Sequence, residues 1–268
     1  MRTALTIAGS DSSGGAGIQA DLKTFQAHGV FGMSAVTAVT VQNTRGVFGI
    51  QEMTPDIVGG QIDCLFDDIT IHAVKIGMVA SVPLIEAIAA ALAGREAAPV
   101  VLDPVMISKS GFPLLQETAQ NALVAHLFPL AAVVTPNIHE AERLIGRPIQ
   151  SLAAMKDAAR AIRDRGARKV VVKGGHLGDA AATDILYDGQ DFRELTAARV
   201  DTPNTHGTGC TFSSAIAAHL AMGASFFEAV ANAKDYISGA IRHSLDIGQG
   251  HGPTHHFFDL YRRAGMEA

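Results

Sequence analysis

The chain has 268 residues, of which 48% are hydrophobic, and its formal net charge at pH 7 is −5. This length and apolar content allow one large α/β domain or two small ones. Lysine and arginine are scattered and form no basic stripe, which argues against a nucleic-acid-binding groove. No apolar run approaches the roughly 18 residues of a membrane span. We therefore expect neither a nucleic-acid nor a membrane partner.

Short apolar strands alternate with longer helical patterns along the chain. The predicted strands cover residues 3–9, 33–42, 47–53, 72–77, 99–105, 131–137, 168–175 and 182–188. The predicted helices, whose apolar residues recur every three or four positions, cover residues 17–29, 56–68, 83–94, 117–128, 155–166, 211–223 and 226–245. Continuous apolar strands such as VVLDPV indicate a mostly parallel sheet with helices on both faces. No linker divides the pattern, so we predict a single domain over residues 1–268, with residues 30–53 the main departure from βα alternation.

The N-terminus and the cysteine content indicate a reducing compartment. The opening MRTALTIAGSDSSGG has one basic residue and no signal-peptide core. The two cysteines, Cys64 and Cys210, are far apart in sequence, so a disulfide framework is not expected. We predict a cytoplasmic protein, in which Cys64 is a buried apolar residue of a helix.

Two glycine-rich turns precede predicted helices. The first, SDSSGGAGIQ (10–19), fits the dinucleotide fingerprint only loosely, because the second strand ends in Gln42 and Asn43 rather than in the acid that a Rossmann dehydrogenase needs. The second, NTHGTGC (204–210), opens an apolar helix whose unpaired N–H groups and dipole favour an anion. Gly207 and Gly209 allow a phosphate to approach the backbone, and Thr208 adds a hydroxyl donor. An ordinary capped helix start is the alternative.

Polar side chains follow several predicted strands at the sheet edge where ligands bind in parallel sheets. Asp103, Asn137 with Glu140, and Lys173 all fall there. A lysine for phosphate oxygens and carboxylates for Mg²⁺ are parts that phosphoryl transfer requires. Taken singly, Glu140 is explained as a first-turn acid of a helix and Lys173 as a solvated strand end. Together, at one edge, they favour an active site.

The motifs QADLKTF, QNTRGV, VKIGM, VLDPVM, VTPNIHEAE and NTHGTGC, with the closing GPTHHF, resemble the hydroxymethylpyrimidine/phosphomethylpyrimidine kinases of thiamine biosynthesis in the ribokinase-like superfamily. The resemblance covers the whole chain. It implies a three-layer α/β/α fold with a central mostly parallel sheet, ATP and Mg²⁺ as cofactors, and two successive phosphorylations of a small pyrimidine. Relatives also imply a homodimer. A pyridoxal/pyridoxine kinase on the same fold is the alternative, and a non-catalytic pyrimidine-binding relative is a third possibility.

The resemblance also implies residue roles. Gln42 would bind the aminopyrimidine edge, because an amide offers both a donor and an acceptor, and Asp21 would add a second polar contact. The pocket would be lined by Gly9, Ala16, Met78 and Val105, of which core packing also explains Met78 and Val105. Mg²⁺ would be held by Asp103 and Glu140. The nucleotide phosphates would contact Lys173, Asn137, Thr208 and the amides of 207–210. His206 is expected to pack its own loop, and residues 108–115 are predicted to form a lid.

Cys210 takes the place of the aspartate that acts as general base in most sugar kinases of this superfamily. Pyridoxal kinases usually keep that aspartate, so the thiol favours the pyrimidine branch. A helix N-terminus lowers the pKa of a thiol, and we expect a usable thiolate near neutral pH for the first step. In the second step the nucleophile is an anionic phosphate, which needs no base and which a neutral thiol does not repel.

Overall fold

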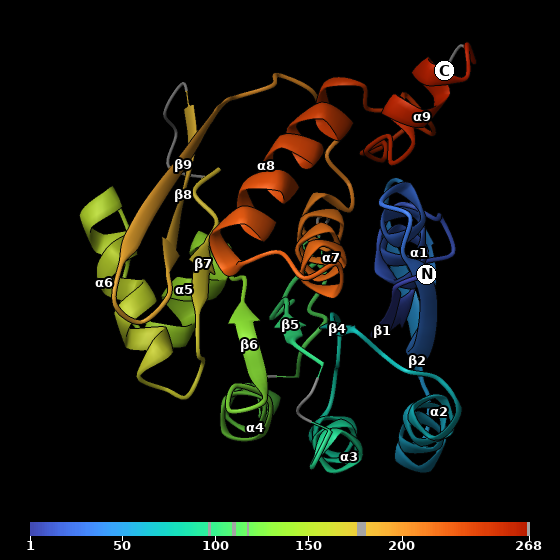
Figure 1. Cartoon of the computed structure of the whole chain (residues 1–268), viewed down its shortest axis with the longest axis vertical. Helices are drawn as coiled ribbons and strands as arrows, with labels where there is room; N and C mark the ends of the chain where they lie inside the picture. The colour runs from blue at the N-terminus through green and yellow to red at the C-terminus, as the bar shows by residue number, and fades with distance from the viewer. Residues whose placement is uncertain (96–97, 109–110, 117, 176–180, 267–268) are drawn as a thin grey trace.

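The computed structural model describes residues 1–95, 98–108, 111–116, 118–175 and 181–266. Within these ranges one sheet has the strand order β3-β2-β1-β4-β5-β6-β7-β8-β9. Helices cover both faces of this sheet, so the chain forms three layers (Figure 1). The predicted α/β/α architecture with a mostly parallel sheet is confirmed.

The central strands are parallel: β2 (Phe31–Asn43), β1 (Thr3–Ser10), β4 (Ala73–Ile76), β5 (Val100–Leu102), β6 (Ala131–Val134) and β7 (Val170–Val172). Antiparallel strands flank them, with β3 (Gly46–Glu52) at one edge and β8 (Ala181–Tyr187) and β9 (Phe192–Ala198) at the other. The β2–β3 hairpin falls within the predicted departure at 30–53. We did not predict β9, because its residues are half-buried or exposed and form no apolar run.

Each helical layer packs on alternate residues of the strands. One layer contains α1 (Gly17–Ala27), α7 (Thr208–Ala221), α8 (Phe226–Arg242) and α9 (Phe258–Arg263). The other contains α2 (Pro55–Asp68), α3 (Val82–Leu92), α4 (Ala119–Ala122) with the π-turn η1 (Leu123–Leu127), α5 (Ile138–Ile145) and α6 (Leu152–Arg163). In β5, Val100 and Leu102 face the second layer and Val101 the first, as the two-residue period of a strand requires. No helix of the described ranges is long and apolar enough to cross a membrane.

Three strands end three residues earlier than the apolar runs suggested: β7 ends at Val172, and a proline follows the other two. β5 ends at Leu102 and β6 at Val134, three residues short of the predicted ends in both cases. Pro104 and Pro136 follow, and a proline has no N–H to continue a strand ladder. The chain therefore leaves the sheet at the positions where the predicted site residues begin.

The prediction that Cys64 is buried is wrong. Its thiol is exposed on α2 and contacts the carbonyl oxygen of Gln61. The buried face of α2 is formed by Val58 and Ile62, four residues apart. Cys64 follows Ile62 by two positions, which places it on the opposite side of the helix.

Candidate active site

Three neighbouring parallel strands bring a charged cluster to one edge of the sheet. Asp103 follows β5, Thr135 follows β6 and Lys173 follows β7. The Nζ atom of Lys173 lies 2.8 Å from Oδ1 of Asp103, and the Thr135 hydroxyl donates to the same oxygen at 3.1 Å. Burial alone would lower the pKa of Lys173, but Asp103 and Glu140 outweigh it and raise the pKa. The predicted lysine and carboxylate therefore form a fixed ion pair.

Glu140 and Asn137 form the N-terminal capping box of α5. The side-chain oxygen of Asn137 accepts from the Glu140 N–H at 2.9 Å, and Glu140 accepts from the Asn137 N–H at 2.8 Å. The helix-start explanation of Glu140 is thus correct. Burial nevertheless raises the pKa of Glu140 to about 7, opposed by Lys173 and assisted by Asp103. Glu140 is therefore a carboxylate whose charge is only partly compensated.

The donor set at this edge fits a magnesium ion. Mg²⁺ binds hard oxygen ligands, and in phosphoryl-transfer sites it uses one or two protein carboxylates together with substrate phosphates. Asp103 and Glu140 are two such carboxylates, and each raises the pKa of nearby Lys173. A divalent cation would compensate the charge that burial leaves on Glu140.

Helix α7 begins directly against this cluster. Its N-cap is Gly207, whose φ of 77° is left-handed, and no side chain caps the helix. A Cβ atom on Gly209 would lie 3.4 Å from Oδ2 of Asp103 and 3.5 Å from Nζ of Lys173. The first-turn N–H groups, which have no partner within a helix, thus lie beside a lysine at the sheet edge. Together these groups can bind phosphate oxygens.

The side chain of Thr208 is arranged differently from our prediction. Its hydroxyl donates to the carbonyl oxygen of Thr205 at 2.7 Å. The hydroxyl proton is therefore used within the turn and is not directed at an anion. The Thr208 N–H donates to the same carbonyl oxygen at 3.3 Å, so both donors of Thr208 are used within the turn and its phosphate role stays a prediction.

Cys210 lies between the N-termini of two helices, and its pKa moves opposite to our prediction. The backbone N–H of Gly17, at the start of α1, is close enough to the thiol to lower its pKa. Burial raises the pKa of Cys210 to about 11, and the carboxylates of Asp21 and Asp103 add to the rise. Lys75 and the Gly17 N–H lower the pKa but do not prevail. The expected thiolate near neutral pH is thus wrong, because desolvation outweighs the helix dipole.

Asp21 is a buried partner of a lysine, and this argues against its predicted contact with the pyrimidine. It has no exposed surface, and its oxygens lie 2.8 and 2.9 Å from Nζ of Lys75. The hydroxyls of Thr6 and Ser214 donate to it at 2.6 Å each. Every side of the carboxylate is therefore engaged. We correct its role to that of a structural anion beneath α7.

Lys75 is a site residue that sequence reasoning missed. It is fully buried on β4, where burial alone would lower its pKa but the Asp21 carboxylate outweighs burial and raises it. Lys75 is also the largest influence that lowers the pKa of Cys210. The available signal was a lysine within the apolar run HAVKIG, because a buried charge requires a partner.

The predicted pocket-lining residues lie at or just after the ends of several strands and at the start of α1. A Cβ atom on Gly9 would lie 3.1 Å from Sδ of Met78, which places these two residues in contact. Gln42 is the last residue but one of β2 and is half-buried. Val105 is half-buried in the turn after β5, where its N–H donates to the Asp103 carbonyl oxygen at 2.8 Å. Ala16 is the N-cap of α1.

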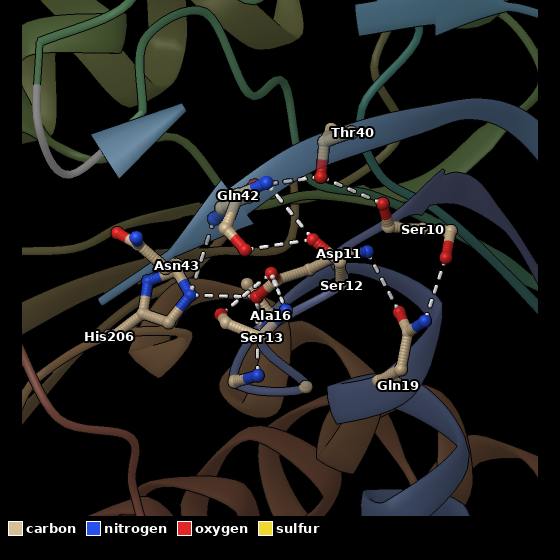
Figure 2. A network of polar contacts seen from close by, with 12 residues as sticks. Ser10, Asp11, Ser12, Ser13, Ala16, Gln19, Thr40, Gln42, Asn43 and His206 are labelled. Atoms are coloured by element: carbon tan, nitrogen blue, oxygen red, sulfur yellow. Dashed lines mark hydrogen bonds and ion pairs between the residues drawn. The ribbon is translucent and has the colours of Figure 1, made fainter. Parts of the chain in front are cut away.

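The first glycine-rich turn is organised by Asp11 (Figure 2). Its carboxylate accepts from the N–H groups of Ser13 at 2.8 Å, Gly15 at 3.2 Å and Ala16 at 2.8 Å. His206 donates to the same carboxylate at 2.8 Å. Burial would raise the pKa of Asp11, but the hydrogen bonds from His206 and Ser13 lower it to about 2. The His206 side chain thus joins its loop to the first turn, and its predicted packing within its own loop stays a prediction.

Part of the predicted lid at 108–115 lies outside the described residues, namely 109 and 110. In the described part, the Phe112 carbonyl oxygen accepts from the Ser108 N–H at 2.8 Å, and the Leu114 N–H donates to Met106 at 2.9 Å. These bonds form a turn beside β5. Its role as a lid stays a prediction.

Comparison with known proteins identifies the same chemistry. Residues 11–255 match a family model described as phosphomethylpyrimidine kinase. The hydroxymethylpyrimidine/phosphomethylpyrimidine kinase of Haemophilus influenzae is 50% identical over 262 residues, which cover 96% of this chain and 97% of that protein. A thiamine biosynthesis bifunctional protein of Geobacter sulfurreducens is 52% identical over 252 residues, and the chain spans about half (51%) of its length.

Solved structures share the fold. The crystal structure of an ADP complex of Bacillus subtilis pyridoxal kinase superposes with a TM-score of 0.89 and 43% identity. The match covers 96% of this chain and 98% of that one. The fold and the level of identity therefore do not by themselves separate a pyrimidine from a pyridoxal substrate.

Proposed function

The chain belongs to the phosphomethylpyrimidine kinase family and is a kinase, and from this premise we propose that it phosphorylates 4-amino-5-hydroxymethyl-2-methylpyrimidine twice, to the monophosphate and then to the diphosphate. ATP is the proposed phosphate donor. The observation that carries the proposal is the position of Gly209 at the start of α7, against the Lys173–Asp103 pair. Phosphoryl transfer depends on positioning and charge neutralisation, and this arrangement offers both.

We assign the transferred phosphate to the space between α7 and the ends of β5 and β7. The Lys173 ammonium and the backbone N–H groups of Gly207, Gly209 and Cys210 would bind its oxygens, with Asn137 close to the nucleotide. These donors are held by the fold before substrate binds, so they need no reorganisation as charge develops. Asp103 and Glu140 would hold Mg²⁺, which when bound neutralises charge on the nucleotide phosphates.

Gln42 would bind the aminopyrimidine edge, with Gly9, Ala16, Met78 and Val105 around the ring. Cys210 is the proposed proton acceptor for the hydroxymethyl group. Because its thiol is neutral near pH 7, the first phosphorylation requires the small thiolate fraction that Lys75 favours. The second needs no proton acceptor, since the monophosphate is already an anion, and a neutral thiol lies beside it without repulsion.

Three functions can be separated by one experiment. The enzyme is incubated with Mg-ATP and either the hydroxymethylpyrimidine or pyridoxal, and the mono- and diphosphate products are detected by mass. We expect both pyrimidine products in sequence. Pyridoxal phosphate as the only efficient product would establish the alternative kinase instead. Pyrimidine binding by calorimetry without ADP release would indicate a binding protein.

We further propose a homodimer that forms through the β2–β3 hairpin. Val41 is 65% exposed and Phe48 66% exposed on these two strands. Neighbouring Val39 is also exposed, so the hairpin presents several large apolar side chains at an open sheet edge. A second copy of the chain would bury them. A cytoplasmic location is proposed from the two free thiols, Cys64 and Cys210.

A further inference from the structure

The side-chain amide of Gln42 lies between two fixed polar groups (Figure 2). Its Oε1 atom is 3.1 Å from the hydroxyl oxygen of Thr40, which is on the same strand. Its Nε2 atom is 3.4 Å from Nε2 of His206, which comes from the loop before α7. An amide oxygen only accepts and an amide nitrogen only donates. The pairing therefore depends on what Thr40 and His206 can offer.

Toward Gln42, the hydroxyl oxygen of Thr40 can act only as a hydrogen-bond acceptor. A hydroxyl has one proton, and the Thr40 oxygen lies 2.9 Å from the backbone carbonyl oxygen of Ser10. A carbonyl oxygen cannot donate, so the proton of Thr40 is used in that bond. The group of Gln42 that pairs with Thr40 is consequently an N–H and not the oxygen.

His206 imposes the same requirement from the other side. Its Nε2 atom lies 2.8 Å from Oδ2 of Asp11. Asp11 already accepts from the N–H groups of Ser13 and Ala16, so it is an ionised acceptor and Nε2 of His206 must carry the proton. Toward Gln42, His206 thus presents a donor. The amide oxygen is the group that can share this N–H.

We propose that the Gln42 amide is turned by half a rotation about its last side-chain bond, with Nε2 toward Thr40 and Oε1 toward His206. Thr40 and His206 are then positioning residues, each of which pairs a donor with an acceptor. Oxygen and nitrogen of an amide are assigned from the network around them, and here two independent neighbours require the same assignment. One N–H and one lone pair of Gln42 remain for a ligand.

The fixed amide determines how a substrate ring can bind. This inference rests on the proposed role of Gln42 at the aminopyrimidine edge. That edge presents an exocyclic N–H next to a ring nitrogen acceptor, so a fixed amide pairs with it in one direction only. Pyridoxal has no exocyclic amine and gains no such pair, so the device selects for the aminopyrimidine.

Thr40→Val tests the proposal, because valine keeps the shape of threonine and removes the oxygen. We expect the KM for hydroxymethylpyrimidine to rise about tenfold, because the Gln42 amide loses one hydrogen bond and can rotate freely. The KM for pyridoxal should change by less than about twofold, because pyridoxal does not depend on the orientation of that amide. Thr40→Ser keeps the oxygen and should restore the wild-type KM. Thr24→Val is the matched control, since the Thr24 hydroxyl is buried in α1 and donates to Ala20.

Equal changes in both KM values, or no change in either, would overturn the positioning role. Failure of the wild-type enzyme to phosphorylate the pyrimidine would instead overturn the proposed function. The orientation itself has a readout that needs no activity and no folded variant of Thr40. In the wild-type protein, the side-chain NH₂ protons of Gln42, identified by their loss in Gln42→Glu, should show NOEs to the Thr40 methyl group. NOEs to the ring protons of His206 in their place would refute the assignment.

Discussion

Gly207 and Gly15 meet so closely that neither loop has room for a side chain between them. A Cβ atom on Gly207 would lie 1.7 Å from the carbonyl oxygen of Gly15, and Gly207 has a φ of 77°. The contact joins the two glycine-rich turns, which are far apart in sequence. It therefore holds the start of α7 against the start of α1, where the Gly17 N–H lowers the pKa of Cys210.

We predict that Gly207→Ala destabilises the protein by more than about 3 kcal/mol, because a backbone clash adds to left-handed strain. Gly223→Ala is the matched control at the other end of α7. Gly223 has a φ of 91° but nothing within 4 Å of its Cβ position, so only strain applies there, about 1 kcal/mol. Chemical denaturation of both variants measures the difference. Equal losses would show that the loops do not constrain each other.

The raised pKa of Cys210 predicts different pH profiles for the two phosphorylations. Burial keeps the thiol neutral near pH 7, so the rate of the first phosphorylation should increase as pH rises toward about 11. The rate of the second phosphorylation should not depend on the ionisation of Cys210. Single-turnover rates with each substrate test this. In Cys210→Asp, the carboxylate should slow the second step by repulsion, and an unchanged second step would contradict that reasoning.

Alkylation provides a direct check on the same thiol. In a Cys64→Ser background, which removes the exposed thiol, iodoacetamide should modify Cys210 slowly at pH 7 and faster at higher pH. Lys75→Met should slow the reaction further, because Lys75 favours the thiolate. Rapid alkylation at neutral pH would show that the helix N-termini prevail over burial.

The raised pKa of Glu140 predicts that the stability of the protein depends on pH. This pKa is raised from 4.5 to about 7, so the folded protein retains a proton that the unfolded chain releases. The contribution of Glu140 to the free energy of unfolding should therefore be largest below about pH 4.5 and should fall as pH rises to about 7. Glu140→Gln should remove that part of the fall in denaturation experiments at several pH values.

The same substitution should separate structure from metal binding. Glutamine can still accept from the Asn137 N–H, so the capping box should survive. We expect the Mg²⁺ concentration for half-maximal activity to rise at least about tenfold, since a charged ligand is lost. An unchanged Mg²⁺ requirement would remove Glu140 from the metal site.

The apolar hairpin predicts an interface. Val41→Glu and Phe48→Glu should each convert a dimer to a monomer in sedimentation equilibrium, because a charge would replace a side chain that the second copy buries. Leu260→Glu is the control, since Leu260 is also exposed but lies on α9. A wild-type protein that sediments as a monomer at micromolar concentration would rule out the dimer.

The layered fold and the residues at the sheet edge could be predicted from the sequence. Runs such as VVLDPV are apolar on both faces of a strand, which requires helices on both sides, and Asp103 and Lys173 follow such runs directly. β9 could not be predicted in this way. It lies at the sheet edge with half-buried and exposed residues, so its pairing with β8 and not its own pattern makes it a strand.

What the sequence determined by itself is local: the glycine turns, the capping box of Asn137 and Glu140, and the motifs that carry the resemblance. What only the tertiary structure decided is the charge environment of Cys210. Asp21 and Lys75 are 54 positions apart, yet they form a fully buried pair beneath α7. Desolvation depends on every segment that excludes water from an atom, and no spacing in one stretch of chain reveals it. For that reason the helix start at NTHGTGC wrongly predicted a thiolate, whereas its role in binding phosphate stays a prediction.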